Sequence, residues 1–445
     1  MKRNKIISLM LCLFLISTLL AACGEKDGQA DKQNDEIVNN EGKKGTEENE
    51  QEDESKSSPQ DVSITYWQHS SQARDNMMKA LAFEFMEQNE NVKIKMEFIP
   101  EADYSTKLIS SLATDAAPDV MQVKSGMISR LVKSNAIQQL DENVLSTSDI
   151  ENDFVHATVE ALNVDGKYYG LPTDVQTIVT YWNKDLLNEA GLDGEKGPQT
   201  WDEMREWAKK LTKVENGTMV QSGWGTKGYA PEVEAIINQY GGKMVDEDGK
   251  FIFADDPKSV EAIKFMVDTY KIDKVYDIEF MKNWAGFRQG KVAMMLGHPA
   301  MFGNLQLTAP NIDLGIGLIP AKGDKHTTIV TSWAYVLGKN ANSEMGTKFI
   351  EYLASEDVEK RWTKETGELP ARKALLDDEE LIEDSQIALL LSSLNDSYVS
   401  FLQLPATYDI WENEYERLIL TDEPLEDVLK EIQQQLNDEI AKDLD

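Results

Sequence analysis

Six tryptophans fall where predicted strands end, and these residues are well suited to hold a small molecule. They are Trp67, Trp182, Trp224, Trp284, Trp333 and Trp411. A polar cluster of Gln68, His69 and Ser70 directly follows the first of them. A flat ring packs on the apolar C–H face of a sugar, while amides, hydroxyls and imidazoles meet its hydroxyl rim. The pattern therefore indicates a carbohydrate site, with burial in a hydrophobic core as the alternative for each ring.

Motifs for catalysis or metal binding are missing from the sequence. His69, His156, His298 and His326 are isolated, with no HExxH or His-x-His spacing, so a catalytic zinc site is not supported. There is no G-x-S-x-G elbow, and the glycines lack the spacing of phosphate or dinucleotide loops. Acidic residues are so abundant that no glycosidase-like pair stands out. We therefore expect no enzyme activity, no cofactor and no metal.

The elements that must position the candidate residues alternate along the first part of the chain. Strand-like segments at 62–67, 92–98 and 119–123 are separated by helical patterns at 77–86 and 104–112. The order strand, helix, strand, helix, strand is typical of an α/β fold with a parallel, right-handed sheet.

The remainder of the chain continues this mixture. Further buried strands are predicted at 177–182, 292–296 and 312–318. Beyond residue 342 the chain is predicted to be mostly helical, and an amphipathic segment at 425–436 closes it.

One helix start has a clear local signal. Thr200 and Glu203 have the spacing of a capping box, in which the two side chains bond amides at the start of a helix. Trp201 and Trp207 lie on this helix, so both are expected in the core, as is Trp362.

Composition limits the class of partner. The chain has 445 residues, and 79 Asp and Glu outweigh 45 Lys and Arg to give a formal charge of −34. A nucleic-acid binder needs cations that displace counterions from phosphate, so this role is excluded. Docking on anionic lipid through a basic patch is disfavoured for the same reason. With 41% hydrophobic residues, the chain is able to bury large cores.

The N-terminus has the pattern of a bacterial export signal. Cationic residues precede an apolar run at 6–22, which ends in Leu-Ala-Ala before Cys23. This order resembles a lipobox, which implies a signal peptide at 1–22 and diacylglycerol on the Cys23 thiol. An uncleaved anchor helix is the alternative. Cys12 is the other cysteine, so nothing downstream can form a disulfide.

The segment at 23–60 is predicted to be a disordered acidic tether. Between residues 25 and 60, twelve Asp or Glu face five Lys, and there is no aromatic residue. Such a segment buries too little apolar surface to offset the entropy of ordering, and its charges repel one another. We expect it to hold a folded body at the outer face of the cytoplasmic membrane of a Gram-positive-type bacterium, anchored by the lipid on Cys23.

A series of short motifs occurs between residue 62 and the C-terminus. They are ITYW at 64–67, VKI at 92–94, YSTKL at 104–108, APDV at 117–120, YGLP at 169–172, YWNKDLL at 181–187, AGL at 190–192, PQTWDE at 198–203, FRQGKVAMM at 287–295 and GELP at 367–370. In type and order they resemble the extracellular solute-binding proteins of bacterial ABC importers, specifically the family with maltodextrin and other sugar receptors.

The resemblance implies a two-lobed, periplasmic-binding-protein-like fold of type II, with a parallel-type sheet flanked by helices in each lobe. Residues 61–167 and 327–373 are then expected to form the N-terminal lobe, and 168–326 and 374–445 the C-terminal lobe. A hinge between the lobes closes them on a ligand in the cleft. The implied partners are a carbohydrate and the membrane permease of an ABC importer, with the receptor acting as a monomer.

The resemblance also points to individual residues. Asp119 and Gln176 stand where relatives often present a sugar-bonding carboxylate or amide, and Trp182 stands where many have a tyrosine. His298 and Phe302 stand near a position where relatives often carry a tryptophan. With Glu368 of the GELP motif, the predicted ligand-binding residues are Trp67, His69, Ser70, Asp119, Gln176, Trp182, Trp224, Trp284, His298, Phe302, Trp333, Glu368 and Trp411.

Four hypotheses follow from the sequence. The first is a lipid-anchored receptor that delivers a carbohydrate to an ABC importer. The second keeps the receptor and changes the ligand to a polyol phosphate, peptide or polyamine. The third is a secreted carbohydrate-active enzyme, against which the lack of a nucleophile–base motif counts. The fourth is a lipoprotein that serves as a sensor subunit or structural partner without a transport role.

Overall fold

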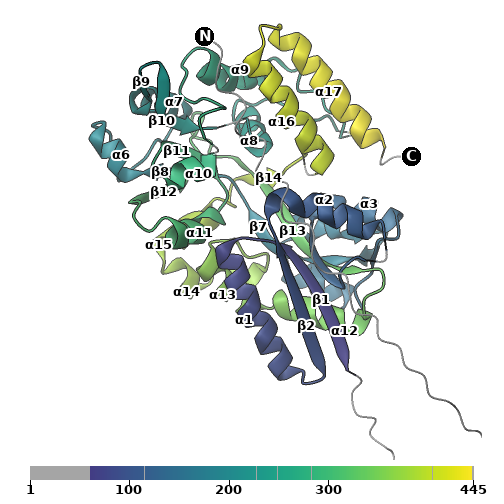
Figure 1. The fold of residues 1–445 in the computed structure, drawn as a ribbon. Coiled ribbons are helices and arrows are strands. Elements are labelled where there is room, and N and C mark those ends of the chain that lie inside the picture. Colours follow the sequence, from purple (N-terminus) through teal and green to yellow (C-terminus); the bar gives the residue numbers. More distant parts are fainter. Residues whose placement is uncertain are drawn as a thin grey trace, which may run out of the picture. The chain divides into compact units, whose positions relative to one another are not determined.

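Two β-sheets flanked by helices organise the chain (Figure 1). The computed structural model describes residues 61–442, apart from residues 115, 227, 248, 282 and 403. The signal peptide predicted at 1–22, the lipidated Cys23 and the tether predicted at 23–60 lie outside the described residues. Each sheet and its helices are called a lobe below.

The sheet of the first lobe has seven strands in the order β14-β13-β3-β1-β2, with β4 and β7 also paired to β13. Its strands are β1 (Val62–His69), β2 (Val92–Ile99), β3 (Val120–Lys124), β4 (Ile137–Gln138), β7 (Gly170–Gln176), β13 (Thr328–Gly338) and β14 (Ser397–Val399). As predicted, β1 runs parallel to β2 and to β3. The sheet is nevertheless mixed, because β13 runs antiparallel to β3 and β7.

The sheet of the second lobe has five strands in the order β12-β8-β11-β10-β9. They are β8 (Val179–Asn183), β9 (Lys213–Glu215), β10 (Thr218–Gly225), β11 (Val292–Gly297) and β12 (Leu314–Leu318). Here β10 and β11 are parallel, whereas β8 is antiparallel to both β11 and β12. A separate two-stranded ribbon consists of β5 (Asn163–Val164) and β6 (Lys167–Tyr168).

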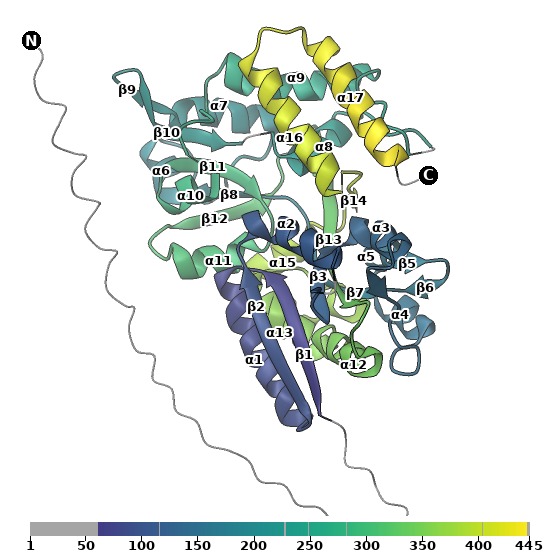
Figure 2. The same ribbon diagram turned by 45° about the vertical axis from the view of Figure 1, so that its right-hand side comes forward.

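Helices cover both sheets. Those of the first lobe are α1 (Gln72–Gln88), α2 (Glu101–Leu112), η1 (Ser125–Met127), α3 (Ile128–Lys133), α4 (Thr147–Asp153), α5 (His156–Val159), η2 (Glu160–Leu162), α12 (Ser343–Leu353), α13 (Glu356–Thr366), η3 (Lys373–Leu375), α14 (Glu379–Ile382) and α15 (Ser385–Ser392). Those of the second lobe are α6 (Lys184–Glu189), α7 (Trp201–Leu211), α8 (Ala230–Gln239), α9 (Pro257–Lys271), α10 (Asn283–Arg288), α16 (Pro405–Leu420) and α17 (Leu425–Ala441). Helix α11 (Met301–Thr308) follows β11 of the second lobe but packs against α1 and α13 of the first. Figure 2 shows α16 and α17 side by side, over the helices of the second lobe.

The strands predicted from alternation are found with small shifts of their ends. The long central strand β13 was not predicted, because nearly every residue from Thr328 to Gly338 is buried and no alternation is visible. The predicted helix cap is present in altered form. The Thr200 hydroxyl accepts the Glu203 amide at 3.2 Å, but the Glu203 carboxylate accepts from the Gln199 amide, one residue earlier than in a capping box.

Three segments connect the lobes, and hydrogen bonds tie these crossings to one another. The first crossing is at Thr177–178 and the second at 327–Thr328. The Ile178 amide donates to the Thr328 hydroxyl at 3.1 Å. The hydroxyl groups of Thr177 and Ser393 are 2.6 Å apart, which joins the first crossing to the segment that leads into the third.

These crossings correct the predicted lobe boundaries. Strand β7 pairs with β13 in the first sheet, so the chain leaves the first lobe after Gln176 rather than after Lys167. Strand β14 also pairs with β13, and α14 and α15 contribute to the first hydrophobic core. The segment from 374 to about 400 therefore stays with the first lobe. The predicted boundary came from the family resemblance and not from a local signal, and strand pairing is a tertiary property.

A buried carboxylate holds the third crossing. Glu234 of α8 accepts hydrogen bonds from the Ser400 hydroxyl at 2.8 Å and the Phe401 amide at 2.9 Å. Burial raises the pKa of Glu234 to about 7, while these hydrogen bonds act in the opposite direction. The contact fixes the second lobe to the chain that arrives from β14.

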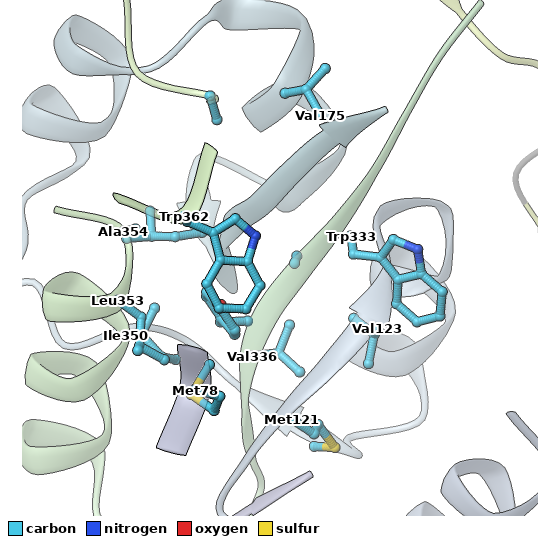
Figure 3. Packing of buried hydrophobic residues seen from close by; sticks show 14 of the residues in the cluster. Met78, Met121, Val123, Val175, Trp333, Val336, Ile350, Leu353, Ala354 and Trp362 are labelled. Carbon is cyan, nitrogen blue, oxygen red and sulfur yellow. The ribbon is translucent and has the colours of Figure 1, made fainter. Parts of the chain in front are cut away.

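Two clusters of buried side chains form the cores. Figure 3 shows part of the first, in which Met78, Met121, Val336 and Trp362 gather around the central strands. The second cluster is centred on Trp201, Trp224 and Trp411, and it packs α7, α8, α9, α16 and α17 on the five-stranded sheet. In the part of the chain that the structure describes, no helix combines the length and the apolar character needed to cross a membrane.

Candidate binding cleft

A cleft of about 810 Å³ lies between the two lobes. The first lobe lines it with residues at the carboxyl ends of β1, β3 and β7, namely His69, Lys124 and Gln176, and with Ser70, Arg74 and Trp333. The second lobe contributes Tyr229, Glu232, Trp284, Arg288, His298, Tyr408, Glu412 and Glu416. Ligand sites in open α/β sheets lie outside the carboxyl ends of parallel strands, and this cleft follows that rule.

Two stacked rings lie in the first-lobe wall of the cleft. The rings of His69 and Trp333 are 4.3 Å apart at an interplanar angle of 28°. His69 also meets the edge of Tyr104, whose hydroxyl donates to the Gln122 carbonyl at 2.6 Å. Burial lowers the pKa of His69 well below its usual value, and the charges of Arg74 and Lys124 lower it further. The imidazole is therefore neutral, and it is stacked on Trp333 in the first-lobe wall of the cleft.

A buried ion pair supports this wall from behind. Arg74 of α1 contacts the Glu368 carboxylate, and both side chains are almost fully buried. The other oxygen of Glu368 accepts from the Trp362 indole at 2.5 Å. Glu368 thus holds Arg74, which reaches the cleft, in one orientation.

A cation contacts aromatic rings of both lobes. The Lys124 ammonium lies 4.2 Å from the ring centroid of Tyr408 in α16 and 5.8 Å from that of Trp333 in β13. A cation over an aromatic face is attracted by the ring quadrupole, by about 0.5–2 kcal/mol. Lys124 therefore links the two walls of the cleft.

Tyr229 and His298 meet at the second-lobe wall. The Tyr229 hydroxyl is 2.8 Å from His298 Nε2, and the two rings are perpendicular. His298 Nδ1 lies 3.1 Å from the Thr177 carbonyl at the first crossing. His298 follows the carboxyl end of β11, and Tyr229 precedes α8 after the carboxyl end of β10.

The remaining second-lobe residues differ in exposure. Glu232 is buried, and burial raises its pKa to about 8 although the Thr226 hydroxyl donates to it at 2.7 Å. By contrast, 36% of the Trp284 surface is exposed. Arg288, Glu412 and Glu416 are exposed at the mouth of the cleft. This wall therefore combines a neutral inner carboxyl group with a charged rim.

Six of the predicted ligand-binding residues line the cleft. They are His69, Ser70, Gln176, Trp284, His298 and Trp333. The Ser70 hydroxyl donates to Asp75 of α1 at 2.5 Å, so its orientation is fixed.

Three predicted tryptophans lie in the core of the second lobe, and their assignment to the cleft is corrected. Trp182 fills a slot between Gly197, Gly315 and Gly317, where an added Cβ would contact the indole, and it donates to the Gly194 carbonyl at 2.7 Å. Trp224 is fully buried beside Trp201.

Trp411 of α16, the third of these, is also fully buried and donates to the Gly228 carbonyl at 2.9 Å. In all three cases tertiary packing turns the ring inward, which alternation along the chain does not reveal.

Four further predicted residues lie outside the cleft. Trp67 is half-buried under the Lys107 ammonium, which is 4.5 Å from its ring centroid. Asp119 accepts from the Thr65 amide and hydroxyl at 2.8 and 2.7 Å, which ties β1 to the start of β3. Phe302 packs beside Gly367, and Glu368 acts on the cleft only through Arg74.

Sequence reasoning missed several residues of the cleft. Arg74, Lys124, Tyr229, Glu232 and Tyr408 all line it. Lys124 ends β3, and Tyr229 follows β10, so the rule that ligands gather at the carboxyl ends of strands could have found both. Arg74 and Glu232 lie in the first turns after such ends. Tyr408 has no such signal, because α16 reaches the cleft only after the third crossing.

Comparison with known proteins assigns this arrangement to a family. Residues 69–360 match the model of the bacterial extracellular solute-binding protein family. The galactooligosaccharide-binding protein of Bacillus subtilis is 24% identical, over 92% of this chain and 91% of its own length. The sn-glycerol-3-phosphate-binding periplasmic protein of Escherichia coli strain K12 is 26% identical, over 71% of this chain and 76% of its own.

Solved structures agree with the fold. A solute-binding protein of an ABC transporter from Thermotoga lettingae, bound with alpha-D-tagatose, superposes with a TM-score of 0.74 at 22% identity. The match covers 85% of this chain and 99% of that one. The two lobes, the hinge crossings and the cleft therefore have the architecture of periplasmic binding proteins. The chain belongs to the bacterial extracellular solute-binding protein family, whose members are binding proteins of ABC transporters and not enzymes.

Proposed function

We propose that this protein captures a carbohydrate in the interlobe cleft and delivers it to the permease of an ABC importer. The observation that carries the proposal is the pairing of flat rings with hydrogen-bonding groups in one cleft. The His69–Trp333 stack lies on the first-lobe wall, and Trp284 lies on the second. Such surfaces suit the two faces of a sugar ring.

The polar groups of the cleft also suit hydroxyls. Gln176 and Tyr229 bring an amide and a hydroxyl to the cleft, and burial raises the pKa of Glu232 to about 8, so that this carboxyl group keeps its proton at neutral pH. Uncharged partners match the uncharged hydroxyls of a sugar without burying an unpaired ion. The binding of sugars by several relatives supports the same ligand class.

The test is a solute panel applied to residues 61–445 by thermal melting and tryptophan fluorescence. Maltotriose, mannobiose, D-tagatose and galactobiose represent the sugars, and sn-glycerol-3-phosphate, a dipeptide and spermidine represent other solutes. A bound sugar is expected to raise Tm with increasing concentration, because binding to the native state stabilises it by mass action. If a solute of another class raises Tm while no sugar does, the carbohydrate proposal fails.

A polyol phosphate is the second candidate. Arg74 and Lys124 bring positive charge to the cleft that they line. Burial is the main cause of the lowered pKa of His69 and His298, and these two charges lower it further. An sn-glycerol-3-phosphate-binding relative supports this candidate. The two ligands differ in their salt dependence: binding of an anion weakens as ionic strength rises, whereas binding of a neutral sugar is nearly unchanged. Titration at 20 mM and 500 mM NaCl therefore separates them.

We further propose that diacylglycerol on Cys23 anchors the protein at the outer face of the cytoplasmic membrane. The support is the Leu-Ala-Ala-Cys sequence after an apolar run. Cys23→Ala is expected to lose incorporation of labelled palmitate and to lose stable membrane attachment through the lipid, while residues 61–445 still bind ligand. Undiminished palmitate labelling of Cys23→Ala would refute lipidation of Cys23 and would leave the proposal for the binding cleft unaffected.

A further inference from the structure

Glu232 is a buried carboxyl group in the second-lobe wall of the cleft. It lies in the first turn of α8, is 1% exposed and lines the cleft. Its Oε2 accepts a hydrogen bond from the Thr226 hydroxyl at 2.7 Å. Its Oε1 has no hydrogen-bond partner among the described residues, and it is not one of their fully enclosed polar atoms. Oε1 is therefore the oxygen that Glu232 presents to the cleft.

The other buried glutamates of the described residues have stronger partners. Glu234 accepts hydrogen bonds from a hydroxyl and a main-chain amide, and Glu359 accepts from two main-chain amides. Glu368 and Glu439 each pair with an arginine. Among the same described residues, Glu232 has one hydroxyl as its donor and no cationic partner. Burial of an ionised carboxylate with so little compensation is costly, so the neutral acid is favoured.

The groups that surround Glu232 act in the same direction. Burial raises its pKa to about 8, while the hydrogen bond from Thr226 opposes this shift. The amino end of α8 also favours a negative charge, but this effect is small beside the desolvation of a buried carboxylate. The phenols of Tyr276 and Tyr415 interact with the charge of Glu232, and both stay neutral because burial raises their pKa.

Other charged groups of this wall lie at the mouth of the cleft. Glu412 and Glu416 project from α16, and Arg288 projects from α10. The two carboxylates oppose a further negative charge at Glu232, whereas the single guanidinium favours one. The cations of the first lobe belong to the opposite wall. The charged rim of the second-lobe wall therefore does not favour ionisation of Glu232.

The hydrogen bonds around Thr226 determine which oxygen of Glu232 carries the proton. The Gly228 amide donates to the Thr226 hydroxyl oxygen at 3.3 Å, and the hydroxyl hydrogen is then directed at Glu232 Oε2. The oxygen that accepts this hydrogen is the carbonyl oxygen of the neutral acid. The acid hydrogen therefore lies on Oε1, and Glu232 presents a donor to the cleft.

We propose that Glu232 binds the solute as a neutral acid and donates the hydrogen on its Oε1 to an acceptor oxygen of the solute. In a sugar, these acceptors are the ring, glycosidic and hydroxyl oxygens. The inference rests on the proposed carbohydrate function for the identity of the solute, but the protonation of Glu232 in the ligand-free protein does not depend on it. Ionised Glu232 has only lone pairs to offer, so binding weakens as pH rises through about 8.

The first experiment reads the protonation of Glu232 without a ligand. Infrared difference spectra of residues 61–445 are recorded between pH 6 and pH 9 for the wild type and for Glu232→Gln. We expect the wild type to lose the C=O stretching band of a protonated carboxyl group with a midpoint near pH 8, and the variant to lack this band. Glu234 titrates in both proteins and cancels in the comparison. Identical spectra for the two proteins would overturn the proposal.

The second experiment compares two replacements of Glu232. In Glu232→Gln, the amide oxygen can accept from Thr226 and the NH₂ group can donate to the cleft at any pH. Glu232→Met has a side chain of similar length that can do neither. Affinities for maltotriose, mannobiose and D-tagatose are measured by calorimetry at pH 6 and pH 9, and melting without ligand checks that each variant folds.

For a probe that binds the wild type, affinity is expected to fall about 10-fold between pH 6 and pH 9, because a pKa of about 8 leaves about a tenth of Glu232 protonated at pH 9. Glu232→Gln should bind as the wild type does at pH 6 and should keep this affinity at pH 9. Glu232→Met should bind about 3- to 10-fold more weakly than the wild type at pH 6, the effect of one lost hydrogen bond.

Equal pH dependence in the wild type and Glu232→Gln, or unchanged binding by Glu232→Met at pH 6, would refute the donor role. Wild-type binding that strengthens with pH would refute it too, because the solute would then donate to a carboxylate. If no sugar binds the wild type, the carbohydrate function fails, and the same variants are tested with sn-glycerol-3-phosphate, which also presents acceptor oxygens. The infrared measurement decides the protonation of Glu232 in either case, so the two failures are distinguishable.

Discussion

The two walls of the cleft are built differently. On the first-lobe wall, His69, Arg74 and Trp333 are all less than 10% exposed, and each contacts another buried side chain. On the second-lobe wall, Trp284 is 36% exposed, and Arg288, Glu412 and Glu416 are exposed as well. The first wall is thus built of buried side chains that pack on one another, whereas the rim of the second wall is exposed to solvent.

The difference follows from the elements that carry each wall. Strands β1, β3 and β7 belong to one sheet, in which β1 pairs with β3, and β13 pairs with both β3 and β7, so their last residues are held by ladder hydrogen bonds and by the core beneath. The second wall draws on the short helix α10 and the outer face of α16, whose side chains extend into solvent. Preformed surfaces reduce the entropy lost on binding, so we expect the ligand to be held first by the first lobe.

The largest expected effect is the loss of Arg74's partner. Glu368→Ala leaves the Arg74 guanidinium buried without its carboxylate, which is expected to destabilise the fold by about 3–5 kcal/mol. Urea unfolding of residues 61–445 measures this change. Glu380→Ala, which removes an exposed ion-pair partner of Lys364, is the control and should leave the midpoint nearly unchanged. Equal urea midpoints for Glu368→Ala and Glu380→Ala would contradict the expectation that the buried ion pair of the first wall stabilises the fold more than a surface ion pair does.

Removal of Trp284 tests the contribution of the second-lobe wall to ligand binding. Trp284→Ala is expected to weaken ligand binding about 3- to 10-fold through the loss of one stacking surface. Its melting temperature without ligand should stay close to that of the wild type, because the ring is not part of either core. Trp411→Ala is the contrasting variant, and its buried ring predicts a clear loss of stability. A strong drop in Tm for Trp284→Ala would contradict the proposed difference between the buried first-lobe wall and the exposed rim of the second-lobe wall.

The buried carboxyl group of the second wall predicts a pH dependence. Burial raises the pKa of Glu232 to about 8, so between about pH 4.5 and pH 8 the folded state keeps a proton that the unfolded state has lost. This contribution makes the fold less stable as pH rises through that window. Glu232→Gln does not titrate, and its oxygen can still accept from Thr226. Its Tm relative to the wild type should therefore increase by about 1–3 °C between pH 5 and pH 8.

Differential scanning calorimetry at several pH values checks this result. The pKa of Glu234 is raised as well, but its titration is common to the variant and the wild type and cancels in the difference. A gap in Tm that stays constant with pH would mean that Glu232 is not held in its protonated form.

The smallest expected effect concerns a contact between the lobes. Arg130 of α3 pairs with Glu439 of α17 at 3.1 Å, which joins the first lobe to the second away from the hinge. Arg130→Gln is expected to shift the ligand-free protein slightly toward open forms, by at most about 1 kcal/mol for a partly exposed pair. Small-angle X-ray scattering at low salt should show a slightly larger radius of gyration. Arg417→Gln breaks ion pairs within the second lobe and should leave this radius unchanged.

Local patterns were sufficient for much of the fold. Alternation identified β1 and β2, and the apolar face of Met77, Met78, Leu81 and Phe85 identified α1, because the period of each pattern matches the geometry of its element. The central strand β13 was not identified from the sequence, for the opposite reason. It is buried on both sides, so its sequence carries no period, and its pairing with β3, β7 and β14 is set by tertiary contacts.

The cleft was predicted less completely than the fold. His69 and Ser70 were found because they lie at the carboxyl end of β1, whereas Trp182 and Trp411 were misplaced in spite of similar local patterns. Trp182 is buried because glycines of two other segments, Gly197 and the β12 residues Gly315 and Gly317, leave a slot of its size. Tyr408 and Trp411 are three residues apart on one helix, yet one reaches the cleft and the other the core.

The sequence by itself determined the class of fold, the family, the excess of negative charge and the residue types that a solute site requires. These properties depend on local periodicity, composition and motifs, which a single chain displays directly. Only the tertiary structure decided which aromatic rings face the cleft, where the chain crosses between lobes, and how His298 joins Tyr229 to the hinge. Those contacts unite residues more than fifty positions apart, and no local signal specifies the partner that each side chain meets.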